Sequence, residues 1–254
     1  MSPDTSTSAL HRSALHRFAL DYVEPHAAQD AEQTPRPDSG ALLRNAFQRY
    51  DMEVRDIDGS GQTLLFAGAV VGGLEGHLTT LVRAYGRAVS EDPAVTREHM
   101  TARKLPVPAE GSDPHTTLPL EVFVVGGTPV SAIVRVPSYT TQAAAAASGT
   151  AQPAAVDFGP DAAEHRWSEG TVVDVFDAVS QDVLTMAGDA VRAIPGIGAA
   201  AVCLNLPRLE SPRGATVEAV IVDADIAAHE QPDIGIRRGV SDAIAQQILE
   251  RASK

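Results

Sequence analysis

Cysteine and aromatic residues are scarce in this sequence. Only one of its 254 residues is a cysteine, Cys203, which excludes an internal disulfide and a zinc site built from several thiolates. Aromatic residues make up 4% of the chain, so Ala, Val, Leu and Ile must fill the hydrophobic core. Cys203 lies in the apolar run 199–206, where a small buried side chain is a better interpretation than a catalytic nucleophile.

Basic residues and long apolar runs are also few. The chain has 20 Lys and Arg against 33 Asp and Glu, a formal net charge of −13, with no stripe rich in Lys or Arg. Nucleic acids and anionic membranes are therefore disfavoured as partners, because their phosphates need basic side chains. No stretch approaches the roughly 20 apolar residues that cross a bilayer, and the first ten residues do not resemble a signal peptide. These features predict a soluble, cytoplasmic protein.

The composition along the chain predicts three regions. Residues 1–39 carry the pentapeptide SALHR twice and are expected to form a helical tail and a proline-rich linker. Residues 40–110 are expected to form a small helix–hairpin–helix part. Residues 111–254 form the largest predicted region, with a loop insert at about 138–170 that contains five consecutive alanines.

Hydrophobic periodicity and capping residues predict most of the regular elements. Helices are expected at residues 41–50, capped by Ser39, and at 78–89, 93–103, 180–194 and 241–251. Strands are expected at residues 52–57, 63–67, 120–125, 129–136, 199–206 and 217–222. The glycine-rich stretch 68–76 is expected to be a loop.

Several well-known site motifs are incomplete. Residues 56–61 resemble the start of a calcium loop, but the twelfth position holds Ala67 instead of a glutamate. The glycine-rich stretches 68–76 and 196–198 fit neither a P-loop nor a dinucleotide fingerprint. The eight histidines show no metal-ligand spacing, and there is no G-x-S-x-G elbow to support a hydrolase.

Asp223 and Asp225 are the most informative carboxylates. They follow the strand predicted at 217–222, and alternate residues on a strand point to the same side. Two such carboxylates could hold Mg²⁺, which binds one or two carboxylates together with phosphate oxygens. On spacing alone, a solvated strand end that leads into a loop is the favoured alternative.

Three stretches follow the order and spacing of one known superfamily. They are residues 91–108 (EDPAVTREHMTARKLPVP), residues 122–137 (VFVVGGTPVSAIVRVP) and residues 193–232, with an Ile-Pro-Gly-Ile-Gly turn and two strands. ATP-grasp carboxylate–amine ligases of the cyanophycin synthetase and glutamate–cysteine ligase type have a Glu-Asp-Lys segment ending in Val-Pro-Val-Pro. A V-x-V-V-G-G…A-x-x-R-x-P hairpin and final strands with a Glu-x-Asn metal pair follow. The chain resembles this superfamily from about residue 41 to its end.

The resemblance implies an α+β fold, a mostly antiparallel sheet with helices on one face, and the cofactors Mg²⁺ and ATP. It identifies Arg135, in the hairpin, as the catalytic residue that contacts phosphate. It places the metal pair at Asp223 and Asp225, or at Ile221 and Asp223 if the gap is placed differently.

Departures from the family pattern predict a degenerate remnant. In the family a strand lysine follows the Val-Pro segment, within a subdomain that closes over ATP, but here the hairpin follows Pro108 so soon that this subdomain is missing. Pro93 replaces the family lysine, Cys203 an acidic residue and Glu121 an arginine. ATP-grasp chemistry forms an acyl phosphate whose charge must be neutralised in a closed site, so weak ATP binding is expected.

Three functions follow from these features. The first is a degenerate ATP-grasp protein without autonomous ligase activity that acts as a binding module or as the partner of another protein. The second is an active, minimal carboxylate–amine ligase that depends on ATP and Mg²⁺. The third is a structural or assembly protein, with a protein partner or a second copy of the chain bound to its surface.

Overall fold

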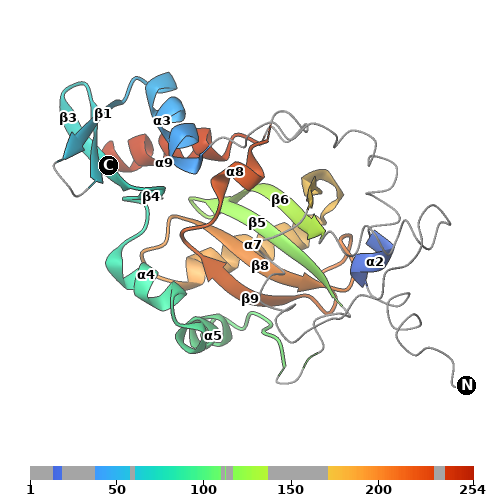
Figure 1. Cartoon of the computed structure of the whole chain (residues 1–254). Helices are drawn as coiled ribbons and strands as arrows, with labels where there is room; N and C mark the ends of the chain where they lie inside the picture. Colours follow the sequence, from blue (N-terminus) through green and yellow to red (C-terminus); the bar gives the residue numbers. More distant parts are fainter. Residues whose placement is uncertain are drawn as a thin grey trace, which may run out of the picture.

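The computed structural model describes residues 14–18, 38–57, 61–109, 112, 117–136, 171–231 and 238–254. These residues form two antiparallel sheets with helices around them (Figure 1). The strand order is β1-β2-β3-β4 in the smaller sheet and β7-β6-β5-β8-β9 in the larger one. The predicted α+β class with a mostly antiparallel sheet is confirmed. The predicted loop insert at 138–170 and nearly all of the predicted linker lie outside the described residues.

The smaller sheet contains two more strands, β3 and β4, than the sequence predicts. Its strands are β1 (Glu53–Ile57), β2 (Gly61–Phe66), β3 (Ala69–Glu75) and β4 (Leu78–Thr79). β3 replaces the predicted glycine loop: a Cβ atom on Gly72 would lie 2.7 Å from Thr80 Oγ1, so glycine permits close packing there. The helix predicted from residue 78 begins later, as α4 (Ala84–Ser90), because its first part is β4 and a turn.

Two helices from opposite ends of the described chain pack together on the smaller sheet. They are α3 (Ser39–Arg49) and α9 (Val240–Ala252), which lie side by side in Figure 1. Their apolar faces share one core cluster with strand residues such as Leu64 and Leu74. Asp38, and not the predicted Ser39, caps α3: its carboxylate accepts a hydrogen bond from the Ala41 amide at 3.0 Å.

The larger sheet is built around the predicted glycine hairpin. Gly126 and Gly127, both at positive φ, join β5 to β6, as the sequence predicts. Its five strands are β5 (Leu118–Val125), β6 (Thr128–Val136), β7 (Thr171–Asp174), β8 (Ala199–Leu206) and β9 (Thr216–Ile221). β7 is a short edge strand that the sequence pattern did not reveal.

Helices cover both faces of the larger sheet, whereas the sequence predicts helices on one face. On one face α7 (Gln181–Ala193), which the sequence predicts as a helix over 180–194 and which Ser180 caps, packs against β5, β6, β8 and β9. On the other face α8 (Ile226–His229) and α9 contact β6, and α9 also contacts β5. Both faces of β5 and β8 are therefore buried, which explains their nearly continuous apolar sequences.

The remaining helices lie at the edges of the molecule. α5 (Pro93–Ala102) begins at residue 93 as predicted and is capped by Asp92. α2 (Ala14–Phe18) contacts β5, and a 3₁₀ turn, η5 (Phe176–Ala178), follows β7. α5 ends at Ala102 and β5 begins at Leu118, so the interval between them is too short for a sheet-containing subdomain. Part of that interval is bound to the larger sheet, because Pro106 O accepts a hydrogen bond from the β9 amide of Val217 at 2.8 Å.

Candidate functional site

Arg135 lies in the interior, on the face of the larger sheet that α8 covers. Its side chain is 4% exposed, and its Nε donates to Glu121 Oε2 at 3.2 Å. Glu121, on the neighbouring strand β5, is equally buried. Arg135 is therefore bound by a carboxylate of its own chain, in a site that water hardly reaches.

His229 extends this ion pair into a chain of four polar side chains. It is the last residue of α8, is fully buried, and its Nε2 lies 3.0 Å from Glu121 Oε1. Its Nδ1 lies 2.9 Å from Ser131 Oγ on β6. With Glu121 ionised, Nε2 donates its proton to the carboxylate, and Nδ1 forms the second hydrogen bond of the ring, with the serine hydroxyl. Arg135, Glu121, His229 and Ser131 are thus joined in series by three hydrogen bonds.

The side chains hydrogen-bonded to Glu121 favour its ionised form. Burial by itself raises the pKa of Glu121, because a carboxylate loses hydration inside the protein. The hydrogen bond from His229 and the charges of His229 and Arg135 act in the opposite direction, and the net effect holds the pKa below its usual value. A buried charge is tolerated here because it is paired and hydrogen-bonded.

Ser131, His229 and Glu121 are hydrogen-bonded in the order of a serine-hydrolase triad, an arrangement that the sequence motifs do not predict. Such a serine must be reachable by a substrate carbonyl. Ser131 and His229 are completely buried, and neither of the two cavities described below contains any member of the chain. Their arrangement fixes α8 to the sheet, and it offers no access for a substrate.

Cys203 lies next to Glu121, on the same face of the sheet. It is paired in register with Glu121, and it is fully buried. Burial, followed by the nearby carboxylates of Glu121 and Glu218, raises the pKa of its thiol well above the usual value. The prediction of a buried cysteine is confirmed, and the thiol is unsuited to nucleophilic chemistry.

Asp223 and Asp225 do not lie on a strand. β9 ends at Ile221, so the alternation that would aim both carboxylates to one side stops before them. Both residues are exposed. Asp225 caps α8: its Oδ1 accepts from the Ala227 amide at 3.1 Å and from Ser39 Oγ at 3.0 Å. The main-chain oxygen of Asp223 lies 2.9 Å from His77 Nε2.

Two of the three predicted site residues make other contacts in the structure. Arg135 is paired with Glu121, Asp225 is used as a helix cap, and no contact joins Arg135 to either aspartate within the described residues. The part of the chain that the structure describes contains no group of three His, Cys, Asp or Glu side chains that could hold a metal ion. The assignment of the three residues to phosphate and metal stays a prediction.

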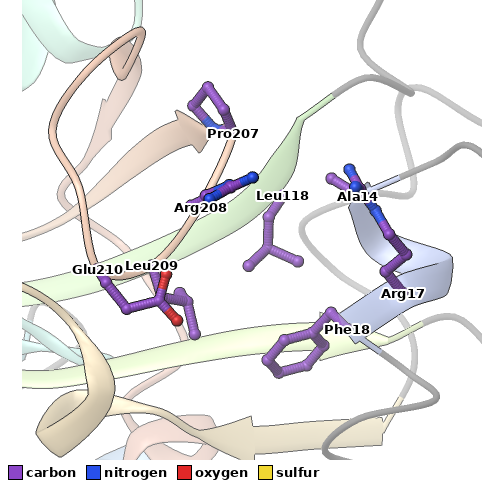
Figure 2. Close-up of a pocket in the computed structure, with 8 residues that line it drawn as sticks. All are labelled: Ala14, Arg17, Phe18, Leu118, Pro207, Arg208, Leu209 and Glu210. Atoms are coloured by element: carbon purple, nitrogen blue, oxygen red, sulfur yellow. The ribbon is translucent and has the colours of Figure 1, made fainter.

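One cavity of about 300 Å³ lies at the start of β5 (Figure 2). In Figure 2, Ala14, Arg17 and Phe18 of α2 form one side, and residues 207–210 of the loop after β8 form the other. It includes no residue that the sequence identified as functional. None of the described helices is long and apolar enough to span a membrane.

Comparison with known proteins establishes the fold. No protein-family model and no curated protein sequence matches the chain. Among solved structures, a bifunctional glutathione synthetase from Pasteurella multocida matches 84% of this chain with a TM-score of 0.62 and 12% sequence identity. This chain has an ATP-grasp-like fold. It spans 43% of the synthetase chain, so the synthetase contains a large part with no counterpart in the ATP-grasp-like chain.

Two structures of the ATP-grasp ligase PsnB also match, at lower similarity. The complex with minimal precursor has a TM-score of 0.46 and 10% identity, over 87% of this chain and 97% of that chain. The complex with a phosphomimetic variant of minimal precursor, Mg and ADP has a TM-score of 0.32 and 10% identity, over 55% and 33%. Both scores are too low to carry an argument, and at 12% identity the match to the synthetase establishes the ATP-grasp-like fold alone.

The sequence analysis did not predict that Glu121, His229 and Ser131 would be hydrogen-bonded beside Arg135. A single glutamate in the otherwise apolar strand LPLEVFVV was the available signal for Glu121, since a charge there needs a buried partner. Ser131 and His229 gave no signal, because nothing local indicates that α8 lies against β6.

Proposed function

We propose that this protein is a degenerate ATP-grasp-fold protein that lacks autonomous ligase activity and acts as a binding or partner module. The observation that carries the proposal is the buried Arg135–Glu121 pair. An arginine that stabilises an acyl phosphate must be free to meet it. Here an internal carboxylate occupies the guanidinium, and displacing it would leave an unpaired charge in the interior.

The structural roles of Pro93 and Asp225 support the same proposal. Pro93, at the position of a family lysine, is the first residue of α5, where proline's fixed φ angle favours helix initiation. Asp225, at the position of a metal ligand, links α8 to α3 through Ser39. Both residues have structural roles in this chain, and both roles are compatible with a fold kept without the chemistry.

A nucleotide titration tests the proposal directly. Thermal unfolding is recorded with and without millimolar Mg-ATP and Mg-ADP, with EDTA as the control, and ATP hydrolysis is measured in parallel. A ligand of the native state adds about 2.7 kcal/mol at one hundred times Kd. We expect no Mg-dependent rise in the melting temperature and no hydrolysis above buffer.

The alternative, an active minimal ligase, predicts the opposite result. Mg-ATP would raise the melting temperature, and the double variant Asp223→Asn and Asp225→Asn would abolish that rise. Asn is as good a helix cap as Asp, so this variant weakens a metal site while it keeps the α8 cap. A Mg-dependent rise in melting temperature that disappears in this variant would refute the proposal that the protein is a degenerate ATP-grasp-fold protein.

The partner of such a module is a protein or a second copy of the chain. Sedimentation of the purified protein across a range of concentrations distinguishes the two, because self-association depends on protomer concentration. A monomer at all concentrations would direct the search to another protein.

A further inference from the structure

A second cavity lies between the smaller sheet and α4, away from the buried chain around Arg135. Its volume is about 380 Å³, which falls within the range of small-molecule sites. The end of β1, the start of β2, the end of β3, β4 and the start of α4 all contribute to it. Its lining includes Ile57, Gln62, Leu74, Glu75, Arg83 and Arg87.

The two arginines beside this cavity differ in their ion pairing. Arg87 donates through Nε to Glu91 Oε1 at 2.9 Å, and the charges of Glu91 and Glu75 help to raise the pKa of Arg87. Arg83 forms no ion pair with any residue that the structure describes. The methylene groups of Arg83 pack over Gly196, so part of its side chain is already held in place.

The rest of the lining combines apolar and polar surface. Leu74 and Leu78 contribute apolar atoms, and Ile57 is 50% exposed at this end of β1, although it is a large hydrophobic residue. Gln62 and Thr80 add an amide and a hydroxyl group. A ligand that fills this site would cover apolar surface and also meet a positive charge.

We propose that this cavity binds a small organic monoanion, with its anionic head group on Arg83 and an apolar body over Ile57, Leu74 and Leu78. A guanidinium presents a planar set of donors that suits carboxylate or phosphate oxygens. Glu75 and Glu91 already offset the charge of Arg87, and this favours one negative charge over two. The site shares no residue with Arg135, Asp223 or Asp225, so it does not depend on the absence of ligase activity.

Calorimetric titration of the full chain with four six-carbon probes tests the proposal. Hexanoate and hexyl phosphate carry the head group in two forms, hexanol lacks the charge, and hexylammonium reverses it. We expect hexanoate to bind with a Kd in the millimolar range and the neutral and cationic probes to bind at least about tenfold more weakly. Hexyl phosphate carries nearly two charges at neutral pH, so its tighter binding would contradict the preference for one charge while still placing an anion site here.

Substitutions locate the binding. Arg83→Gln keeps the packing over Gly196 and should weaken hexanoate at least about fivefold, and Glu75→Gln should strengthen it by removing a repelling charge. Arg251→Gln is the matched control: Arg251 is exposed, forms no ion pair within the described residues and lies outside the cavity. Thermal unfolding of each variant confirms that it is folded.

Three results would overturn the proposal. One is no heat from hexanoate or hexyl phosphate at about 100 mM, well above the expected millimolar Kd. Another is equal binding of hexanol, which would show that the charge is irrelevant. The third is equal weakening by Arg83→Gln and Arg251→Gln, which would indicate nonspecific attraction to surface arginines.

Discussion

Glu121 and Arg135 present the main energetic question at the residue scale. Removing two charges from water costs several kcal/mol, and their mutual attraction offsets this only when further hydrogen bonds satisfy them. His229 supplies one of these bonds to Glu121 through Nε2. Its other ring nitrogen, Nδ1, is hydrogen-bonded to Ser131. Each of the four hydrogen-bonded side chains therefore depends on its neighbour, and loss of one leaves a buried polar group without its partner.

Replacing Glu121 by Gln should lower the free energy of unfolding by about 3 kcal/mol, because it leaves the guanidinium of Arg135 buried without a countercharge. Urea unfolding followed by circular dichroism measures the loss. Glu53→Gln is the control, since it breaks a fully exposed pair with Arg55 and should change nothing measurable. Equal stability of the two variants would show that the buried pair contributes nothing.

The pH dependence of stability follows from the lowered pKa of Glu121. The unfolded chain binds a proton at this carboxylate at a higher pH than the folded chain does. The stabilisation is therefore fully present at neutral pH and is lost as the pH falls below roughly 4, through the folded pKa. Unfolding free energies at a series of pH values should decline less steeply in acid for Glu121→Gln than for the natural chain. Parallel profiles would contradict this prediction.

At the scale of elements, α8 links three parts of the fold through polar groups. Asp225 and Ser39 connect its start to α3, and His229 connects its end to β5 and β6. Glu230, just beyond it, accepts hydrogen bonds from the amide and hydroxyl of Ser241 at the start of α9. A helix of four residues has little stability of its own, so these side-chain contacts hold it in position.

Asp225→Ala should lower the free energy of unfolding by about 1 kcal/mol, through loss of the α8 cap and of the bond from Ser39. Asp223→Ala is the matched control, because the hydrogen bond of Asp223 to His77 uses its main-chain oxygen. Denaturant unfolding without metal measures both. If Asp223 and Asp225 acted only as metal ligands, neither variant would lower the free energy of unfolding under these conditions.

At the scale of the whole molecule, the two sheets share helices. α9 contacts β3 of the smaller sheet and β5 of the larger one, and Figure 1 shows it beside α3 with α8 close by. The core cluster around α9 includes Phe123 and Ala201 from the larger sheet. The sheets are thus joined by a continuous apolar core, and we expect them to unfold together.

Ile244→Ala tests that coupling. Truncating this fully buried α9 side chain should cost about 2–5 kcal/mol, because it removes apolar contacts and leaves a cavity. Cys203 in the larger sheet reports on the distant part, since its buried thiol reacts with a thiol reagent only after unfolding. Circular dichroism and thiol labelling should shift to lower urea concentration by the same amount. A shift in only one probe would show that the sheets unfold separately.

The sequence by itself determined the elements whose signals are local. Asp92-Pro93 fixed the start of α5, Ser180 the start of α7, and Gly126-Gly127 the β5–β6 turn, because caps and turns depend on residues only a few positions apart. β3 and β7 were missed, since a glycine-rich strand and a four-residue edge strand carry too weak a pattern.

Tertiary structure alone decided what surrounds Arg135. The sequence identified this arginine, but the partners that occupy its site come from elsewhere: Glu121 from the adjacent strand and His229 from a helix 108 positions beyond Glu121. Ser39 and Asp225 meet across 186 positions in the same way. Such contacts depend on strand order and on which face a helix covers. These are properties of the packed chain, set by burial of apolar surface that any short stretch of sequence shares with many others.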